Sequence, residues 1–103
     1  MSRLFAALLS SLLVVTLANA TAAADAANGE KLAKRWCAAC HIVSSEQSRG
    51  TTQAPPFAEV ARKAGFDQGM LAYFLLVPHP KMPDMNLSRT EAADLAAYIA
   101  KQK

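Results

Sequence analysis

The stretch Trp36-Cys37-Ala38-Ala39-Cys40-His41 decides how the rest of this 103-residue chain is arranged. Two cysteines separated by two residues and followed at once by a histidine form the C-x-x-C-H signature of covalent c-type haem attachment. The two thiols add across the vinyl groups of the macrocycle, and their spacing places both sulfurs near one edge of the ring. His41 comes next and is the predicted proximal ligand of the iron. We therefore expect one haem c, held by Cys37, Cys40 and His41.

Three other uses of the cysteine pair fit the sequence less well. A redox dithiol is expected after a strand and before a helix, and nothing upstream of Cys37 resembles a strand. A structural zinc site needs four ligands, but the only other histidine is His79 and there is no second cysteine pair. A disulfide between Cys37 and Cys40 would close a very short loop, which stabilises little.

The N-terminal segment, 1–24, has the pattern of a cleaved secretory signal peptide. A short basic start precedes an uncharged apolar run at 4–18, and small residues follow in two Ala-x-Ala sequences. Cleavage after Ala20 or after Ala24 fits this pattern, and we prefer Ala24 because Asp25 then opens a helical pattern. A retained membrane anchor is less favoured, because a spanning helix needs about 20 apolar residues.

Export agrees with the predicted cofactor, because haem c is assembled on the far side of the bacterial inner membrane. The mature protein, 25–103, is therefore expected in the periplasm as a single domain, with membrane contact only if the N-terminal segment is retained. Its roughly 80 residues are too few to bury a large core unaided. The haem is expected to complete that core, so the haem-free form should be poorly folded.

The net charge of the chain does not indicate a nucleic-acid partner. The whole chain carries +3, and removal of Arg3 leaves ten of the eleven Lys and Arg against eight Asp and Glu. This near balance gives no argument for nucleic-acid binding.

Periodicity and capping residues predict four short helices, an all-α fold. The expected ranges are Asp25 to Trp36, Pro56 to about Ala64 before Gly65, a helix capped by Asp67 with its body at 70–77, and a last helix opened by the capping box Ser88-Arg89-Thr90-Glu91. Inward stripes are expected at Phe57, Val60, Ala61 and Ala64, and at Ala92, Leu95, Ala96, Tyr98 and Ile99.

Two further features of these helices predict packing. Gly29 and Ala33 form a small-residue stripe that should allow the last helix to approach the first closely. The third helix is apolar nearly all round and should be buried on more than one side, between haem and protein, with Met70 in the core. Trp36 suits either the wall of the haem pocket or a core position.

The connecting segments supply further candidate haem contacts. Pro55 lacks a backbone N–H, and its carbonyl is the candidate acceptor for the second ring nitrogen of His41. The proline-rich loop 78–86 carries Met82 and Met85, and one of the two is expected to be the distal iron ligand. Arg49 is either a partner of a haem propionate or, preferably, a solvated surface residue.

The order of these parts resembles the small class I monohaem bacterial cytochromes c over essentially the whole mature chain. The resemblance rests on Gly29 eight residues before the first haem cysteine, the C-x-x-C-H motif, Pro55, Met82-Pro83 and the inward Tyr98. It implies the cytochrome c fold and Met82 as the distal ligand, with Met85 the runner-up. Family members often carry an aromatic residue where this chain has Ala33, a difference that Trp36 would compensate.

We therefore expect a periplasmic single-electron carrier, not an enzyme, because saturated His/Met ligation leaves no iron position for a substrate. Its partners should be redox proteins, such as a dehydrogenase, an oxidase or a membrane respiratory complex, met as a monomer or in transient complexes. Four basic residues flank the haem-associated segments and are either a weak docking rim for an acidic partner or, slightly favoured, ordinary solvated charges: Lys31, Lys34, Arg35 and Lys81. The alternatives are a haem subunit of a periplasmic dehydrogenase complex and, less favoured, an enzyme or gas sensor with an open iron site.

Overall fold

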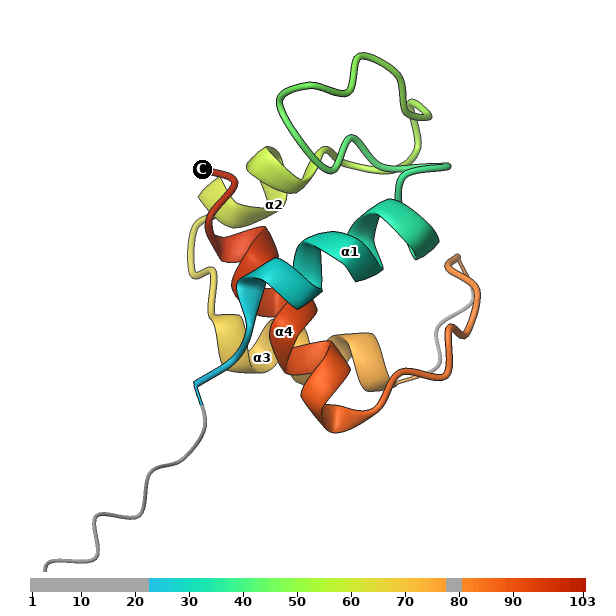
Figure 1. Ribbon diagram of the computed structural model, residues 1–103. Coiled ribbons are helices and arrows are strands. Elements are labelled where there is room, and N and C mark those ends of the chain that lie inside the picture. The colour runs from blue at the N-terminus through green and yellow to red at the C-terminus, as the bar shows by residue number, and fades with distance from the viewer. Residues whose placement is uncertain (1–22, 78–80) are drawn as a thin grey trace, which may run out of the picture.

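The computed structural model describes residues 23–77 and 81–103, and within these ranges it contains four α-helices and no strand. The helices are α1 (Ala26–Trp36), α2 (Phe57–Arg62), α3 (Gln68–Leu76) and α4 (Arg89–Ala100). Helix α4 is the centre of the arrangement, because each of the other three packs against it, and Figure 1 shows α1 crossing it. The predicted all-α fold is confirmed.

Three helices begin at the capping residues that the sequence indicates. The carboxylates of Asp25 and Asp67 accept hydrogen bonds from backbone N–H groups three residues later, at 3.1 and 2.7 Å. At α4, the Ser88 hydroxyl oxygen accepts from the Glu91 N–H at 3.0 Å, and the Glu91 carboxylate accepts from the Ser88 N–H at 2.9 Å. These side chains satisfy N–H groups that a helix start leaves without intrahelical partners.

The crossing of α1 and α4 depends on a glycine. A Cβ atom on Gly29 would overlap the backbone carbonyl oxygen of Asp94 and lie 2.8 Å from the Cβ of Tyr98. Ala33, one turn later, is fully buried. The predicted close approach along the Gly29 and Ala33 stripe is therefore present.

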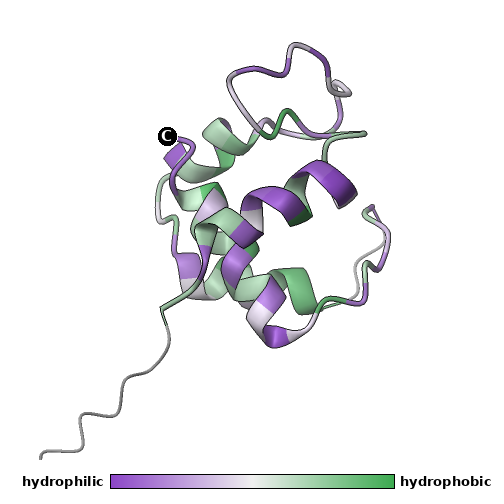
Figure 2. Ribbon diagram, in the orientation of Figure 1, coloured by the Kyte–Doolittle hydropathy of each residue, from purple (hydrophilic) through white to green (hydrophobic). Residues whose placement is uncertain are grey.

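The protein core lies along the inner face of α4. Its central cluster joins α4 to α1, to the start of α2 and to Val43 in the intervening loop, and consists of Ala33, Cys37, Val43, Phe57, Leu95, Tyr98 and Ile99. All five inward residues predicted for the last helix are buried. Figure 2 shows the contrast between this interior and the hydrophilic outer face of α1.

Helix α2 ends two residues earlier than predicted. It ends at Arg62, because Lys63 leaves the helical conformation with ψ of 138°. The Phe66 N–H donates to the Lys63 carbonyl at 3.0 Å, and Gly65 takes a φ of 76°, so these residues form a turn toward α3. Ala64 consequently lies exposed in that turn instead of on the inward stripe.

Helix α3 is less buried by protein than predicted. Leu71 and Leu75 pack against the core, but Met70 and Tyr73 are each 67% exposed. The expected core position of Met70 is wrong. Only one face of α3 meets α4, and a run that is apolar all round does not indicate which face that will be.

Two sequence predictions lie outside the described residues. Most of the predicted signal peptide falls in 1–22, and His79 falls in 78–80. None of the helices in 23–77 and 81–103 has the length and apolar content needed to cross a bilayer.

Candidate haem-binding site

The C-x-x-C-H motif forms a hydrogen-bonded turn that continues directly from α1. The Cys37 N–H donates to the Ala33 carbonyl at 2.9 Å, and the N–H groups of Cys40 and His41 donate to the Cys37 carbonyl at 3.1 and 2.8 Å. The motif is therefore anchored to the end of the helix that crosses α4. The turn and the loop 81–87 lie on the same side of the helical core (Figure 1).

The two thiols have different surroundings. Cys37 is buried, and this burial raises the pKa of its thiol to about 11, from an ordinary value of 9.0. Cys40 is exposed, and the two cysteines are not joined in a disulfide. Cys37 is thus part of the core cluster, while Cys40 faces outward from the turn.

His41 is held at three of its atoms. Its backbone N–H donates to Cys37, its carbonyl accepts from Gln47 at 2.8 Å, and its ring Nδ1 lies 2.6 Å from the carbonyl oxygen of Pro55. A carbonyl can only accept, so Nδ1 carries the proton. The other ring nitrogen, Nε2, then has its lone pair available, and no described residue is hydrogen-bonded to it.

The ring of His41 also packs against an aromatic side chain. Its centroid lies 5.3 Å from that of Phe57, whose own ring contacts Tyr98 edge-on at 6.4 Å. The Phe57 N–H donates to the Ile42 carbonyl at 2.9 Å, which ties the start of α2 to the residue after His41. The imidazole is therefore fixed by a hydrogen bond at one edge and by packing on its face.

Gln47 organises the loop that follows, and the sequence analysis did not single it out. Its amide nitrogen lies within 3.0 Å of the carbonyl oxygens of Ala38, His41 and Arg49, and its amide oxygen accepts from the Val43 N–H at 3.0 Å. The partners are backbone groups whose positions depend on the conformation of the loop. A glutamine in a polar segment gives no signal of this role in the sequence.

Asp94 is the second residue that the sequence analysis missed. It is a charged side chain only 4% exposed, and its carboxylate accepts from the Asp25 N–H at 2.7 Å and from the Asn28 side-chain amide at 2.9 Å. These bonds fasten the start of α1 to α4. The available signal was its position four residues before the inward Tyr98, on the same helix face.

The two candidate distal ligands lie in a loop shaped by a local hydrogen bond. The Asn86 N–H donates to the Asp84 carboxylate at 2.8 Å, and Asn86 adopts a φ of 51°, which asparagine tolerates better than most residues. Met82 and Met85, on either side of Asp84, are both half-buried. Their burial does not distinguish one methionine from the other.

Exposed apolar and basic side chains lie on α1 and α3. The last turns of α3 are strongly hydrophobic (Figure 2) and include the exposed side chains of Phe74 and Leu76. Trp36 is 42% exposed, so it is not the core aromatic that was one of its two predicted roles. The Arg35 guanidinium lies 4.8 Å from the ring centroid of Trp36.

One residue of the predicted basic rim is paired within its own helix. Lys34 forms an ion pair with Glu30 at 2.8 Å, which raises the pKa of this lysine.

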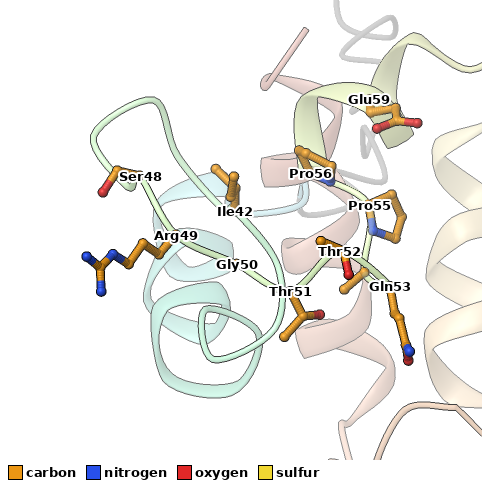
Figure 3. Close-up of a pocket in the computed structure, with 11 residues that line it drawn as sticks. Ile42, Ser48, Arg49, Gly50, Thr51, Thr52, Gln53, Pro55, Pro56 and Glu59 are labelled. Carbon is orange, nitrogen blue, oxygen red and sulfur yellow. The ribbon is translucent and has the colours of Figure 1, made fainter.

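A shallow pocket lies beside the Pro55 segment. It is lined by the loop 48–56 together with Ile42 and Glu59. Figure 3 shows the Arg49 side chain directed away from Thr51 and Pro55. Arg49 is exposed and forms no ion pair within the described part of the chain.

These residues fit a covalently attached haem. An exposed thiol and a buried thiol stand on one turn, an imidazole has its Nδ1 proton engaged and its Nε2 available, and apolar side chains of α3 lie outside the protein core. Two thioether-bearing residues lie in the loop 81–87. Among the described residues no three His, Cys, Asp or Glu side chains gather as a ligand set for a bare metal ion.

Comparisons with known proteins agree with this chemistry. A family model described as "Cytochrome C oxidase, cbb3-type, subunit III" matches residues 24–99. The chain is also 53% identical over 88 residues to cytochrome c-552 of Bradyrhizobium diazoefficiens, an alignment that covers 85% of each chain. No solved structure matches significantly. The chain therefore belongs to this family of c-type cytochromes, whose members carry a covalently bound haem c and transfer electrons.

Proposed function

We propose that this cytochrome is a periplasmic single-electron carrier, attached to its haem through Cys37 and Cys40, with His41 and Met82 as the axial ligands. The observation that carries the proposal is the 2.6 Å contact between His41 Nδ1 and the Pro55 carbonyl. It fixes the tautomer in which Nε2 is a lone-pair donor, which is the form that a metal-binding imidazole requires.

Each residue has a defined task in this proposal. When bound, the haem supplies a one-electron change between Fe(III) and Fe(II). Cys37 and Cys40 would hold it by thioether bonds, and Pro55 orients His41 through its carbonyl. Hydrogen bonding at Nδ1 also increases the basicity of the coordinating nitrogen, which favours binding to the iron. A methionine as the second iron ligand would favour the reduced state and so raise the potential.

Met82 is proposed as the distal ligand because Met82-Pro83 resembles the Met-Pro pair of the family's ligating methionine in its place in the sequence. With both axial positions filled by protein, no iron position remains for a substrate. The protein then changes little between the two oxidation states, which suits a carrier. The N-terminal segment fits this role as an export signal, with cleavage proposed after Ala24.

Visible spectroscopy of the exported, haem-matured protein tests the proposal. We expect a haem c spectrum, the long-wavelength Met-to-Fe(III) band in the oxidised state, and no change when carbon monoxide is added to the reduced protein. Met82→Ala should abolish the band and allow carbon monoxide to bind, whereas Met85→Ala, the matched control, should retain the wild-type behaviour.

The opposite results choose between the alternatives. Loss of the band in Met85→Ala alone would transfer the ligand role to Met85. Carbon monoxide binding by the wild-type protein would favour an open-site enzyme or gas sensor. Stable co-purification with a larger redox enzyme would favour a haem subunit of a complex, a role suggested by the oxidase subunit named in the family description.

A further inference from the structure

The side chain of Gln47 links the haem-attachment turn to the loop that follows it. Its amide nitrogen lies 3.0 Å from the Ala38 carbonyl oxygen, 2.8 Å from that of His41 and 2.6 Å from that of Arg49. An amide group has two hydrogens, so one of them is shared between two of these acceptors. Ala38 and His41 belong to the C-x-x-C-H turn, whereas Arg49 lies on the returning half of the loop.

The orientation of this amide is determined by its partners. Three carbonyl oxygens face the nitrogen, and the Val43 N–H faces the oxygen at 3.0 Å. A flipped amide would place oxygen against three carbonyl oxygens and the NH₂ group against an N–H. Only glutamine combines both donors and the acceptor at this reach, because glutamate lacks the donors and asparagine is one methylene shorter.

We propose that Gln47 is a positioning residue for the proximal ligand, and that it sets the plane of the His41 imidazole by fixing the backbone from which the ring projects. The inference rests on the proposed function, in which His41 binds the iron. Pro55 holds the ring at Nδ1, and Gln47 holds the main chain of the same residue through its carbonyl. Together they leave little freedom for rotation about the bonds between backbone and ring.

Two substitutions separate the contributions of this side chain. Gln47→Met removes all four contacts at nearly constant length, and Gln47→Glu removes the donors while keeping an acceptor for Val43. The matched control is Gln53→Met, the same change in the same loop at an exposed glutamine that forms no hydrogen bond among the described residues. Ser88→Ala, which removes the α4 cap, controls for a general loss of stability.

The readout is the pattern of hyperfine-shifted haem methyl resonances in the NMR spectrum of the oxidised holoprotein, because these shifts depend on the planes of the axial ligands. We expect both Gln47 variants to change the order or spread of the four methyl shifts and to shift the midpoint potential. In the reduced protein, Gln47→Met should also accelerate exchange of the Val43 amide hydrogen about tenfold or more, since its acceptor is lost. Gln53→Met and Ser88→Ala should leave the methyl pattern unchanged.

Two results would overturn the inference. Methyl shifts and potential identical to those of the wild type in both Gln47 variants would show that His41 is oriented without this side chain. The same shift changes in Ser88→Ala would show that they follow stability and not position. Failure of the proposed function is distinguishable, because the wild-type protein would then lack the spectrum of a His/Met-ligated haem c before any Gln47 variant is compared.

Discussion

The hydroxyl of Tyr98 donates a hydrogen bond of 2.6 Å to the carbonyl oxygen of Val43, a residue 55 positions earlier in the chain. Gln47 accepts from the N–H of the same residue, so the main chain of Val43 is held on one side by α4 and on the other by its own loop. Val43 is only 2% exposed, and water has no easy access to these groups.

Removal of the Tyr98 hydroxyl should therefore destabilise the protein. We expect Tyr98→Phe to lower the free energy of unfolding by about 1–3 kcal/mol, because the buried Val43 carbonyl loses the one donor it has among the described residues. Urea denaturation of the haem-matured protein measures this change. Tyr73→Phe, at an exposed tyrosine of α3, is the matched control and should change the free energy by less than about 0.5 kcal/mol.

Tyr98→Phe also tests how the stability of the protein depends on pH. Burial raises the pKa of Tyr98 above its ordinary value of 10.0, with a smaller contribution from the charge of Glu30. The unfolded chain then loses this proton at a lower pH than the folded one. The contribution of Tyr98 to the free energy of unfolding should be present in full below pH 10 and should be lost as the pH rises through the folded-state pKa. Urea midpoints between pH 9 and 11.5 should fall less steeply for Tyr98→Phe than for the wild type; equal slopes would contradict the assignment.

A methyl group at Gly29 should be poorly tolerated. It would overlap the backbone of Asp94, and neither helix can move without disturbing the crossing. We expect Gly29→Ala to cost about 1–3 kcal/mol or more, in spite of the better helix propensity of alanine. Gly69→Ala is the control, because a Cβ there meets only the Asp67 carboxylate, at 3.3 Å, and should change stability by less than about 1 kcal/mol. Equal stability of the two variants would contradict the close crossing.

The buried Asp94 carboxylate should contribute more to the stability of the protein than an exposed carboxylate does. The Asp94 carboxylate accepts from two donors, and in Asp94→Asn the new NH₂ group would face one of these donors. We expect the free energy of unfolding, measured by urea denaturation, to fall by about 1–3 kcal/mol. Glu59→Gln, at an exposed residue of α2, should be nearly neutral. A neutral result for both would mean that the start of α1 is held by packing alone.

The N-terminus of the exported protein should be Asp25. Cleavage after Ala24 would convert the Asp25 backbone N–H, which lies 2.7 Å from the Asp94 carboxylate, into a charged ammonium group. A charged donor makes a shorter and stronger bond to a carboxylate than a neutral one. Intact-mass measurement of the haem-loaded protein checks this prediction, and a mass corresponding to a chain that starts at Thr21 would contradict it.

Local patterns allowed much of this fold to be predicted from the sequence. Asp25, Asp67 and Ser88 mark helix starts because a capping side chain acts within three residues of its own position. Gly29 indicated a close helix crossing because few other reasons place a glycine inside a helix. The contact between His41 and Pro55 was anticipated because a ligating imidazole needs an acceptor for its second nitrogen.

The features that were missed depend on distant parts of the chain. Gln47 binds carbonyls whose positions exist only after the loop has folded, and Asp94 satisfies donors 66 and 69 residues away. Met70 was misplaced because a helix that is apolar all round carries no periodic signal of which side meets the protein. The ligand roles of Cys37, Cys40, His41 and Met82 stay predictions until the spectra are measured.

The pairing of α1 with α4 has a consequence for the order in which the chain folds. The first helix of the domain finds its partner only in residues 89–100, so the core cannot close until almost the entire chain is present. Contacts of such large sequence separation form late, because a long loop must be closed first. In the proposed export, a chain that crosses the membrane N-terminus first would present Cys37 and Cys40 in an unfolded segment until the last helix had followed. The topology would thereby keep the thiol of Cys37, which is buried in the folded protein, accessible for the proposed attachment of the haem.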